Sequence, residues 1–404
     1  MVNGIDAYGI RCENDARIAQ YLLDDVLIKR VKAELDRLIE KGPMGVRRRL
    51  LSSSVRLSRS MSPAVHKMTD HCMDRLGVDI PLELYAYAGP QFNAACFKPE
   101  EGRLFIIFSS SLLEAFDNSE LMFVVGHELG HHVYQHHDIP VGFILNGQQR
   151  PPASLALQLF AWTRYAEISA DRAGAFCADE LNAVARALFK LASGLTSDRI
   201  VSFSLNEFLQ QLDEMQAVDA EPGQGAPMQD WFSTHPFSPL RVKALQLFHR
   251  SGLMLDGGMG KDELEIGVQA MMGLMEPAYL EGHTEVAKIM RLLFIAGAIA
   301  VANARDGIGE QEKAVMKEFM GEGFALDVLN IDKLIDTLPA RIDSAKRHAS
   351  ITQRMQVVRD LGVVARAEGE ITDNELVVLY AIADGLEIPR SMLSHILDAV
   401  AGLD

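Results

Sequence analysis

An H-E-x-x-H stretch at residues 127–131 lies inside a mostly apolar segment of the chain. On an α-helix, residues at positions i and i+4 share one face, so His127 and His131 would direct both imidazoles the same way. Two histidines and a glutamate are costly to bury in so hydrophobic a helix unless they have a partner. We therefore expect a helix that presents both histidines to a metal ion.

The glutamate of the motif can serve as a proton acceptor beside the metal. Glu128 lies beside the pair and within reach of a water molecule at the metal. Zinc lowers the pKa of a water molecule that it binds to about 7, and a nearby carboxylate then accepts the proton. The alternative is a chance motif on a solvated helix face, and the hydrophobic surroundings argue against it. Asp117 or Asn118 can cap the helix, with Glu120 in its first turn.

Composition and charge limit the class of protein. The chain has 404 residues, 48% of them hydrophobic, so a sizeable core and two or three units are expected. The formal net charge of -16 disfavours nucleic acid and anionic membrane surfaces as partners. The N-terminus lacks a signal-peptide pattern, and the longest apolar run, 292–302, is too short to span a bilayer. The cysteines are scattered and form no C-x-x-C pair, which is typical of a reducing compartment. We expect a cytoplasmic protein with no membrane span.

Hydrophobic spacing predicts a mainly α protein with a small β-sheet. Residues 1 to about 60 are expected to be helical, with apolar residues at helical spacing over 16–41, and a further helix covers 63–76. Alternation then predicts three strands, at residues 82–87, 93–97 and 103–108. A hairpin turn is expected at 99–102. The edge of such a sheet can hold an extended peptide through main-chain hydrogen bonds.

A loop over 138–150 and one long helix, from Ala153 to about Ser193, are expected next. Small residues at 166, 170 and 173–175 would let another helix approach this one closely. A catalytic zinc needs three protein ligands and one open position, and Glu167 is our candidate third ligand. Asp171 would accept a hydrogen bond from a ligating imidazole and fix its tautomer. The alternative is a salt-bridged face in which both acids pair with Arg164 and Arg172.

A flexible acidic loop, within 213–229, leads to the aromatic stretch 231–237 and a helix that begins near Pro239. If this stretch returns to the site, His235 can hydrogen-bond the oxyanion of a tetrahedral intermediate. A purely structural histidine before proline is the alternative.

Together these motifs resemble the HtpX and CAAX-prenyl-protease family of zinc metallopeptidases (gluzincins). The matching run extends from about Leu82 to Phe248. The residues that carry it are Asn93-Ala94 on the presumed edge strand, Ser119-Glu120-Leu121 before the H-E-x-x-H helix, His136 five residues after the second histidine, Glu167-Ile168-Ser169-Ala170-Asp171, and Ser233-Thr234-His235-Pro236 with Arg241. These motifs together, in the family's order, are specific, whereas H-E-x-x-H alone is not.

The resemblance implies a zincin-type metallopeptidase domain and assigns roles. The metal ligands would be His127, His131 and Glu167, and the catalytic residues would be Glu128 as general base and His235 as transition-state stabiliser. Asp171 and Arg241 would be supporting residues, and substrate would lie along Asn93, Ala94 and Ala95. One catalytic zinc ion is the implied cofactor. His132 and His137 are interpreted as surface or structural residues.

The C-terminal part is expected to be all-helical and to follow a linker at 256–260. A weak internal repeat relates residues 302–312 to 365–375: each copy ends an apolar helix at glycine and starts the next at an acidic turn. This arrangement is similar to the TerB (tellurite-resistance) helical domain. Capping, as by Thr372 and Glu375, is favoured over binding of a second metal at these turns.

The sequence thus predicts three parts, namely an N-terminal helical segment (1–60), a zinc metallopeptidase domain (61–252) and a TerB-like helical domain (262–404). We expect an endopeptidase that acts on exposed or unfolded polypeptide, whose helical domain regulates it or binds a protein partner. One alternative is a non-catalytic zinc-containing scaffold. Another is a latent protease, held shut by the 213–230 loop or the C-terminal half, which truncation after about Ser251 would activate.

Overall fold

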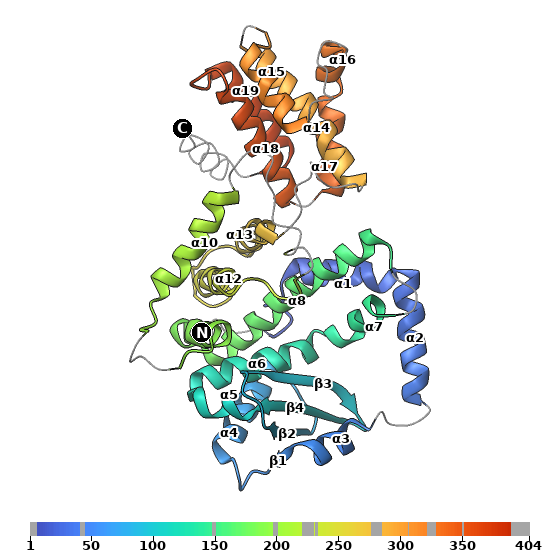
Figure 1. Ribbon diagram of the computed structural model, residues 1–404, viewed down its shortest axis with the longest axis vertical. Coiled ribbons are helices and arrows are strands. Elements are labelled where there is room, and N and C mark those ends of the chain that lie inside the picture. The colour runs from blue at the N-terminus through green and yellow to red at the C-terminus, as the bar shows by residue number, and fades with distance from the viewer. Residues whose placement is uncertain are drawn as a thin grey trace. The chain divides into compact units, whose positions relative to one another are not determined.

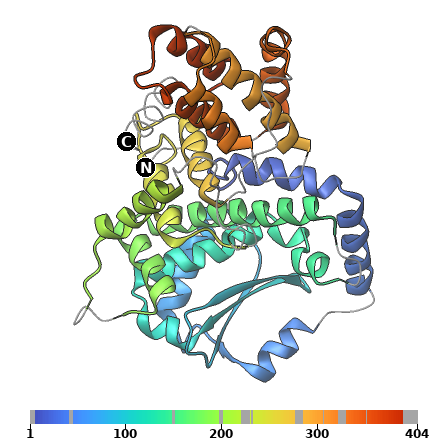
Figure 2. The ribbon, with the colours of Figure 1, turned by 45° about the horizontal axis from the view of Figure 1, so that its top comes forward.

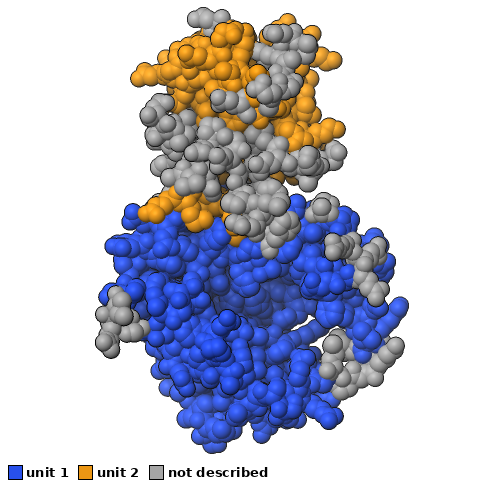
Figure 3. Space-filling view, in the orientation of Figure 1, with its two compact units in different colours: residues 1–212, 232–268 blue, residues 213–231, 269–404 orange. Residues whose placement is uncertain are grey.

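The structure, a computed structural model, describes residues 6–40, 45–147, 151–196, 201–219, 230, 233–275, 285–305, 307–320, 329–349 and 351–388. The protein is mainly α with a small β-sheet, as the sequence predicted (Figure 1). It divides into two compact units, one of residues 1–212 with 232–268 and one of 213–231 with 269–404 (Figure 3). The three-part division proposed from the sequence remains a prediction.

The first unit contains a four-stranded sheet in the order β1-β2-β4-β3. Its strands are β1 (Val55–Leu57), β2 (Leu82–Tyr87), β3 (Ala94–Glu100) and β4 (Arg103–Ser109). β2 and β4 are parallel, and β3 is an edge strand that pairs antiparallel with β4. Glu101 and Gly102 form the hairpin turn with φ of 50° and 70°, as a two-residue turn of type I′ requires. The three predicted strands and their turn are confirmed. β1, in a segment predicted to be helical, is too short for periodicity to reveal.

The N-terminal segment contains α1 (Glu13–Asp24), α2 (Val26–Glu40) and α3 (Val46–Ser53), and α4 (Pro63–Leu76) follows β1. The stretch 16–41 is helical, as its spacing predicted, but it forms two helices because the chain breaks at Asp25. The Oδ1 atom of Asp25 accepts hydrogen bonds from the backbone N–H of Leu27 at 2.8 Å and of Ile28 at 3.2 Å. This side chain therefore caps a new helix. α4 ends, as predicted, at Gly77 in the left-handed conformation.

The H-E-x-x-H stretch lies on α6 (Asn118–Val133), which follows the short helix α5 (Ser110–Ala115). Asp117 caps α6, and Glu120 completes a capping box with it. The predicted loop over 138–150 is interrupted by the single turn η1 (His136–Asp138) and by α7 (Val141–Leu145). The predicted long helix is two helices, α8 (Ala153–Ala178) and α9 (Leu181–Ser193), because Asp179 adopts a φ of 53° that ends α8. Helices α10 (Leu205–Asp219), α12 (Ser238–Arg250) and α13 (Lys261–Met272) follow.

α6 and α8 lie side by side in both ribbon views and form the most extensive helix pair of the first unit (Figures 1 and 2). Small residues allow this approach, as the sequence predicted. A Cβ built on Gly130 would be 2.8 Å from the Cβ of Ala173. A Cβ on Gly174 would be 2.5 Å from the backbone oxygen of Phe123. Only glycine therefore fits at these two positions without moving one helix away from the other.

Gly174→Ala is expected to destabilise the protein by about 1–3 kcal/mol, because the added methyl group overlaps backbone that cannot turn aside. Urea unfolding monitored by circular dichroism measures this loss. Gly142→Ala is the matched control, since a Cβ on that helical glycine meets no atom within 4 Å. It should be neutral or stabilising by up to about 1 kcal/mol. Equal effects of the two changes would show that helix separation does not depend on Gly174.

In the described residues, the second unit is helical. Its elements are η2 (Gly273–Met275), α14 (Glu285–Asn303), α15 (Glu310–Met320), α16 (Ile331–Asp336), α17 (Leu338–His348), α18 (Ile351–Arg366) and α19 (Asp373–Gly385). The predicted Thr372–Glu375 capping box is present at the start of α19. In the other copy of the repeat, the backbone N–H of Gly309 donates to Glu312 at 2.8 Å. Asp306, part of the first acidic turn, lies outside the described residues.

α14 corrects one expectation from the sequence. Its residues Val286–Asn303 are long and apolar enough to cross a membrane by length and composition, whereas the run at 292–302 was expected to be too short. Just over half of this stretch, 56%, is buried inside the structure. Residues such as Leu293, Phe294 and Val301 pack with α18 and α19 in one hydrophobic core. Buried core helices of other proteins can be equally long and apolar, so the length and composition of α14 are weak evidence for a membrane span.

Candidate metal centre

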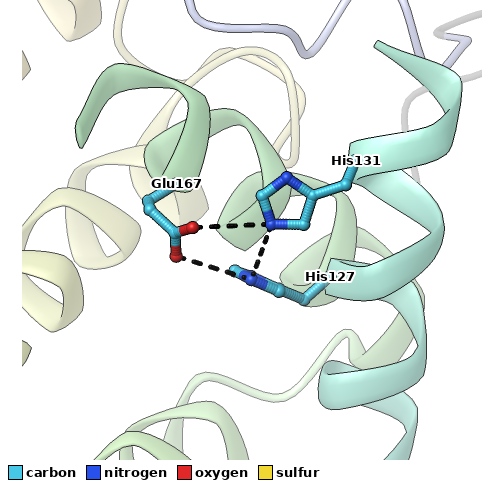
Figure 4. Close-up of side chains that lie close together, drawn as sticks. All are labelled: His127, His131 and Glu167. Carbon is cyan, nitrogen blue, oxygen red and sulfur yellow. Dashed lines mark hydrogen bonds and ion pairs between the residues drawn. The ribbon is translucent and has the colours of Figure 1, made fainter. Parts of the chain in front are cut away.

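Three donor groups from α6 and α8 converge at one point in the first unit (Figure 4). The Nε2 atoms of His127 and His131 are 3.2 Å apart. The Glu167 carboxylate faces both of them, with Oε2 at 3.5 Å from His127 Nε2 and Oε1 at 3.5 Å from His131 Nε2. In the part of the chain that the structure describes, this is the one group of three or more acids, histidines or cysteines whose ligand atoms all come within 4.8 Å of one another.

These separations fit a tetrahedrally bound zinc ion. Donor atoms about 2.0–2.2 Å from such an ion are about 3.3–3.6 Å from each other. The Oε2 atom of Glu167 is buried and accepts no hydrogen bond from any described residue, although buried polar atoms ordinarily do. His127 Nε2 and Arg241 Nη2 each lie 3.5 Å from it. The residues present therefore suit a zinc ion by number, chemistry and spacing.

The outer nitrogen of His127 is held by an acid. Its Nδ1 donates to Asp171 Oδ1 at 3.0 Å, which leaves the lone pair of Nε2 directed at the other donors. Arg241 holds the same acid from the opposite side, through Nε to Oδ2 at 2.8 Å and Nη2 to Oδ1 at 2.6 Å. Burial opposes ionisation of Asp171, but Arg241 and His127 outweigh it and lower its pKa to about 2. The Asp171 carboxylate thus accepts from His127 and fixes the orientation of its ring.

His131 is held through a second histidine. Its Nδ1 lies 2.8 Å from Nδ1 of His136, whose Nε2 lies 3.0 Å from Oδ2 of Asp15 on α1. Burial, together with the neighbouring imidazoles of His127 and His136, keeps the pKa of His131 well below its usual value. A neutral imidazole is the form that binds metal.

Glu128 points from α6 to the edge strand. Its Oε2 accepts a hydrogen bond from the backbone N–H of Cys96 on β3 at 2.8 Å. Burial raises the pKa of Glu128, and the nearby Glu167 adds to this effect. A carboxylate with a raised pKa beside a metal centre is a suitable general base.

The free edge of β3 faces α6. The carbonyl of Asn93 accepts from Ser109 on the β4 side, whereas the N–H of Cys96 points to Glu128. Because main-chain groups alternate along a strand, those of Ala94 and Cys96 face the free edge and those of Asn93 and Ala95 face β4. Of the three predicted substrate-binding residues, Ala94 is therefore the one whose main-chain groups point to the free edge. The main-chain groups of Cys96 point the same way.

His235 lies at the same site, on the segment that precedes α12. Its Nε2 is 3.5 Å from Oε1 of Glu167, and its side chain is 62% exposed. The hydroxyl of Thr234 lies 2.9 Å from Nδ1 of His235, and Arg164 donates to the carbonyl of Ser233 at 3.2 Å. The neighbouring aromatic residues Trp231 and Phe232 lie outside the described residues.

Two partners of the site were missed by sequence analysis. The Cys96 N–H is a backbone group and has no side-chain signal. Asp15 lies 121 positions before His136 and follows no motif spacing. The sequence shows that His136 follows His131 by five residues. It does not show that His136 contacts Asp15 on the N-terminal helix α1.

A helix with H-E-x-x-H, joined by a glutamate from a second helix, is the arrangement of a zinc-dependent peptidase. Comparison of the sequence with protein families agrees: residues 60–248 are similar to peptidase family M48. The closer resemblance to HtpX and the TerB-like assignment of the C-terminal part stay predictions.

Among curated proteins, the chain is similar to the plastoglobule-localized metallopeptidase 48, chloroplastic, of Arabidopsis thaliana. The two are 27% identical over 221 residues, which cover 50% of this chain. The match spans 61% of the length of that relative. The relative's name gives a chloroplast location, and the cytoplasmic location expected for this chain stays a prediction. No solved structure matches the chain.

Proposed function

We propose that the protein is a zinc-dependent metalloendopeptidase that hydrolyses peptide bonds in exposed or unfolded polypeptide. The observation that carries this proposal is the convergence of His127, His131 and Glu167 beside Glu128, next to the free edge of a β-strand. The M48 match over residues 60–248 supports the same reaction class. The cytoplasmic location and the absence of a nucleic-acid partner are proposed on the sequence arguments alone.

The residues of the chain divide the work of hydrolysis. His127, His131 and Glu167 would hold zinc, and the bound ion would supply Lewis acidity for the scissile carbonyl and for a water molecule. Glu128 takes the proton of the attacking water and passes it to the leaving nitrogen. His235 donates a hydrogen bond from Nε2 to the developing oxyanion, with Nδ1 accepting from the Thr234 hydroxyl.

Substrate selection follows from the edge strand. An extended peptide alongside β3 would pair with the main chain of Ala94 and Cys96, while Asn93 and Ala95 contact it by side chain. Such pairing gives affinity without strong sequence preference and requires an extended substrate. Folded proteins are therefore poor substrates, and unfolded segments are good ones.

Removal of the metal tests the proposal. Incubation of an unfolded protein with the wild type is expected to give fragments detectable by mass spectrometry. A chelator such as 1,10-phenanthroline should abolish them, and zinc added in excess should restore them. Because one catalytic zinc ion is proposed, activity should rise in proportion to the zinc bound and reach its maximum at about one zinc ion per protein chain. Fragments that persist in a metal-free preparation would refute a metallopeptidase.

His235→Ala is expected to lower kcat by about 10²–10³-fold while zinc stays bound, because one oxyanion donor is lost. The kinetic constants are measured with a quenched fluorescent peptide, and zinc is measured by atomic absorption. His132→Ala is the matched control, since this histidine follows His131 but is not one of the three converging ligands and forms no hydrogen bond with them in the described structure. Loss of zinc from the His235 variant would show that it acts as a ligand instead.

A latent enzyme is the second candidate, and the hydrogen bond from Cys96 N–H to Glu128 favours it. Cys96 N–H must be free to pair with substrate, and Glu128 must be free to accept a proton.

The described structure also changes the proposed truncation. Glu265 on α13 is paired with the buried Arg172 of α8, so a cut after Ser251 would remove a structural partner. A cut after Val268 keeps it. Higher activity of the shortened chain would indicate inhibition by the C-terminal half, whereas bound zinc without cleavage in either form would indicate a non-catalytic scaffold.

A further inference from the structure

Asp15, on the N-terminal helix α1, is one of the most completely bonded acids in the structure. Its side chain is buried and accepts hydrogen bonds from Ser169 Oγ at 2.7 Å and Trp162 Nε1 at 3.0 Å. Arg11 donates to both oxygens, at 2.8 and 3.1 Å. Burial raises its pKa, but the bonds from His136 and Arg11 prevail and hold the pKa of Asp15 below its usual range. Asp15 is therefore a buried, ionised acceptor.

The ionised state of Asp15 fixes the protons of two histidines. A carboxylate accepts, so Nε2 of His136 is the donor in their 3.0 Å contact. With Nε2 of His136 as the donor to Asp15, its Nδ1 is placed to accept the proton of His131 Nδ1 at 2.8 Å. The lone pair of His131 Nε2 is thereby directed at His127 and Glu167. The three side chains form a hydrogen-bonded series in which His136 donates to Asp15 and His131 donates to His136.

The N-terminal segment is attached to this site by further contacts. The backbone N–H of Cys12 donates to Ser169 Oγ at 3.1 Å, and Tyr134 donates its hydroxyl proton to the carbonyl of Ala7 at 2.8 Å. Ser169 lies between Glu167 and Asp171 on α8. All these partners of the segment belong to the M48 stretch, residues 60–248, whereas the segment itself lies before it.

We propose that Asp15 and His136 are positioning residues of the metal centre, so that α1, outside the M48 stretch, completes the support of the ligand His131. The centre then has one carboxylate for each histidine: Asp171 contacts His127 directly, and Asp15 acts on His131 through His136. This inference rests on the proposed zinc site. It makes the N-terminal segment a requirement for tight metal binding.

The test is the zinc affinity of the full chain, measured by competition with a chromophoric chelator. His136→Phe keeps the ring volume but removes both nitrogens, and it should weaken zinc binding about 10–100-fold. His136→Gln can still accept from His131 and donate to Asp15, and it should recover part of the loss. Ser169→Ala is the matched control: it removes another bond to Asp15 and the anchor of Cys12 but leaves the series to His131 intact, so its zinc affinity should stay within about threefold of wild type.

Asp15→Asn should weaken zinc binding as His136→Phe does, because the amide cannot accept from Arg11, Ser169 and His136 together. Asp24→Asn, an exposed acid on the same helix, should have no effect. Thermal unfolding of the metal-free variants separates support of the fold from support of the metal. If zinc affinity falls in step with stability, in Ser169→Ala as in His136→Phe, the positioning role is overturned. Wild-type affinity in His136→Phe would also overturn it, whereas a wild type that binds no zinc would overturn the proposed function instead.

Discussion

Glu128→Gln is expected to lower peptide cleavage by about 10²–10⁴-fold and to leave zinc binding unchanged within a few-fold. Glutamine has nearly the same size, and its amide oxygen still accepts the hydrogen bond of Cys96 N–H. It cannot take a proton from water. The ligand atoms of His127, His131 and Glu167 are untouched by this change, so the variant separates proton transfer from metal binding.

The measurement combines two readings on one preparation. Cleavage of an unfolded protein is followed by mass spectrometry, and zinc content is determined on the same sample. Glu114→Gln, an exposed acid on α5, is the control for the loss of one negative charge. Turnover retained in the Glu128 variant would refute the assigned base. Loss of zinc would show that Glu128 supports the ligands rather than the proton transfer.

Local spacing was enough to locate most of the candidate site. The i, i+4 rule placed His127 and His131 on one face. Small residues at 166, 170 and 173–175 predicted that another helix would approach the segment that carries Glu167, the candidate third ligand. The structure brings these groups together as expected, with ligand atoms within 4.8 Å. These are properties of single helices and of their packing surfaces, which the sequence displays directly.

Other parts of the site depend on contacts that no local pattern records. Asp15 meets His136 only because α1 packs against α8, which is a tertiary event between segments far apart in the chain. The bond from Cys96 to Glu128 uses a backbone group and so is independent of residue type. Helix breaks at Asp25 and Asp179 were missed for a related reason: hydrophobic periodicity continues on both sides, and one side-chain cap or one positive φ ends the helix.

Arg241→Met is expected to destabilise the protein by about 3–5 kcal/mol, because it leaves the buried Asp171 carboxylate with His127 as its one hydrogen-bond partner among the described residues. In the wild type, Arg241 donates one hydrogen bond to each oxygen of Asp171, which helps to lower the pKa of Asp171 to about 2. Without the guanidinium, ionised Asp171 has lost its main compensation. Chemical unfolding of the zinc-free protein measures the change.

Arg250→Met, an exposed position at the end of the same helix, is the matched control and should change stability by less than about 0.5 kcal/mol. Arg241→Lys should lie between the two, since lysine keeps the charge but not the planar fork that meets both carboxylate oxygens. A small effect of Arg241→Met would show that the bond from His127 alone stabilises Asp171.

The double variant Asp171→Leu with Arg241→Met separates the fold from the metal centre. Replacement of both members of a buried ion pair by apolar residues is often nearly neutral, so at least half of the lost stability should return. Zinc affinity should not return with it, because His127 still lacks the acceptor that fixes its tautomer, and a deficit of about 10–100-fold is expected. If the double variant regains both stability and zinc affinity, Asp171 does not orient the ligand, and its pairing with Arg241 only stabilises the contact between α8 and α12.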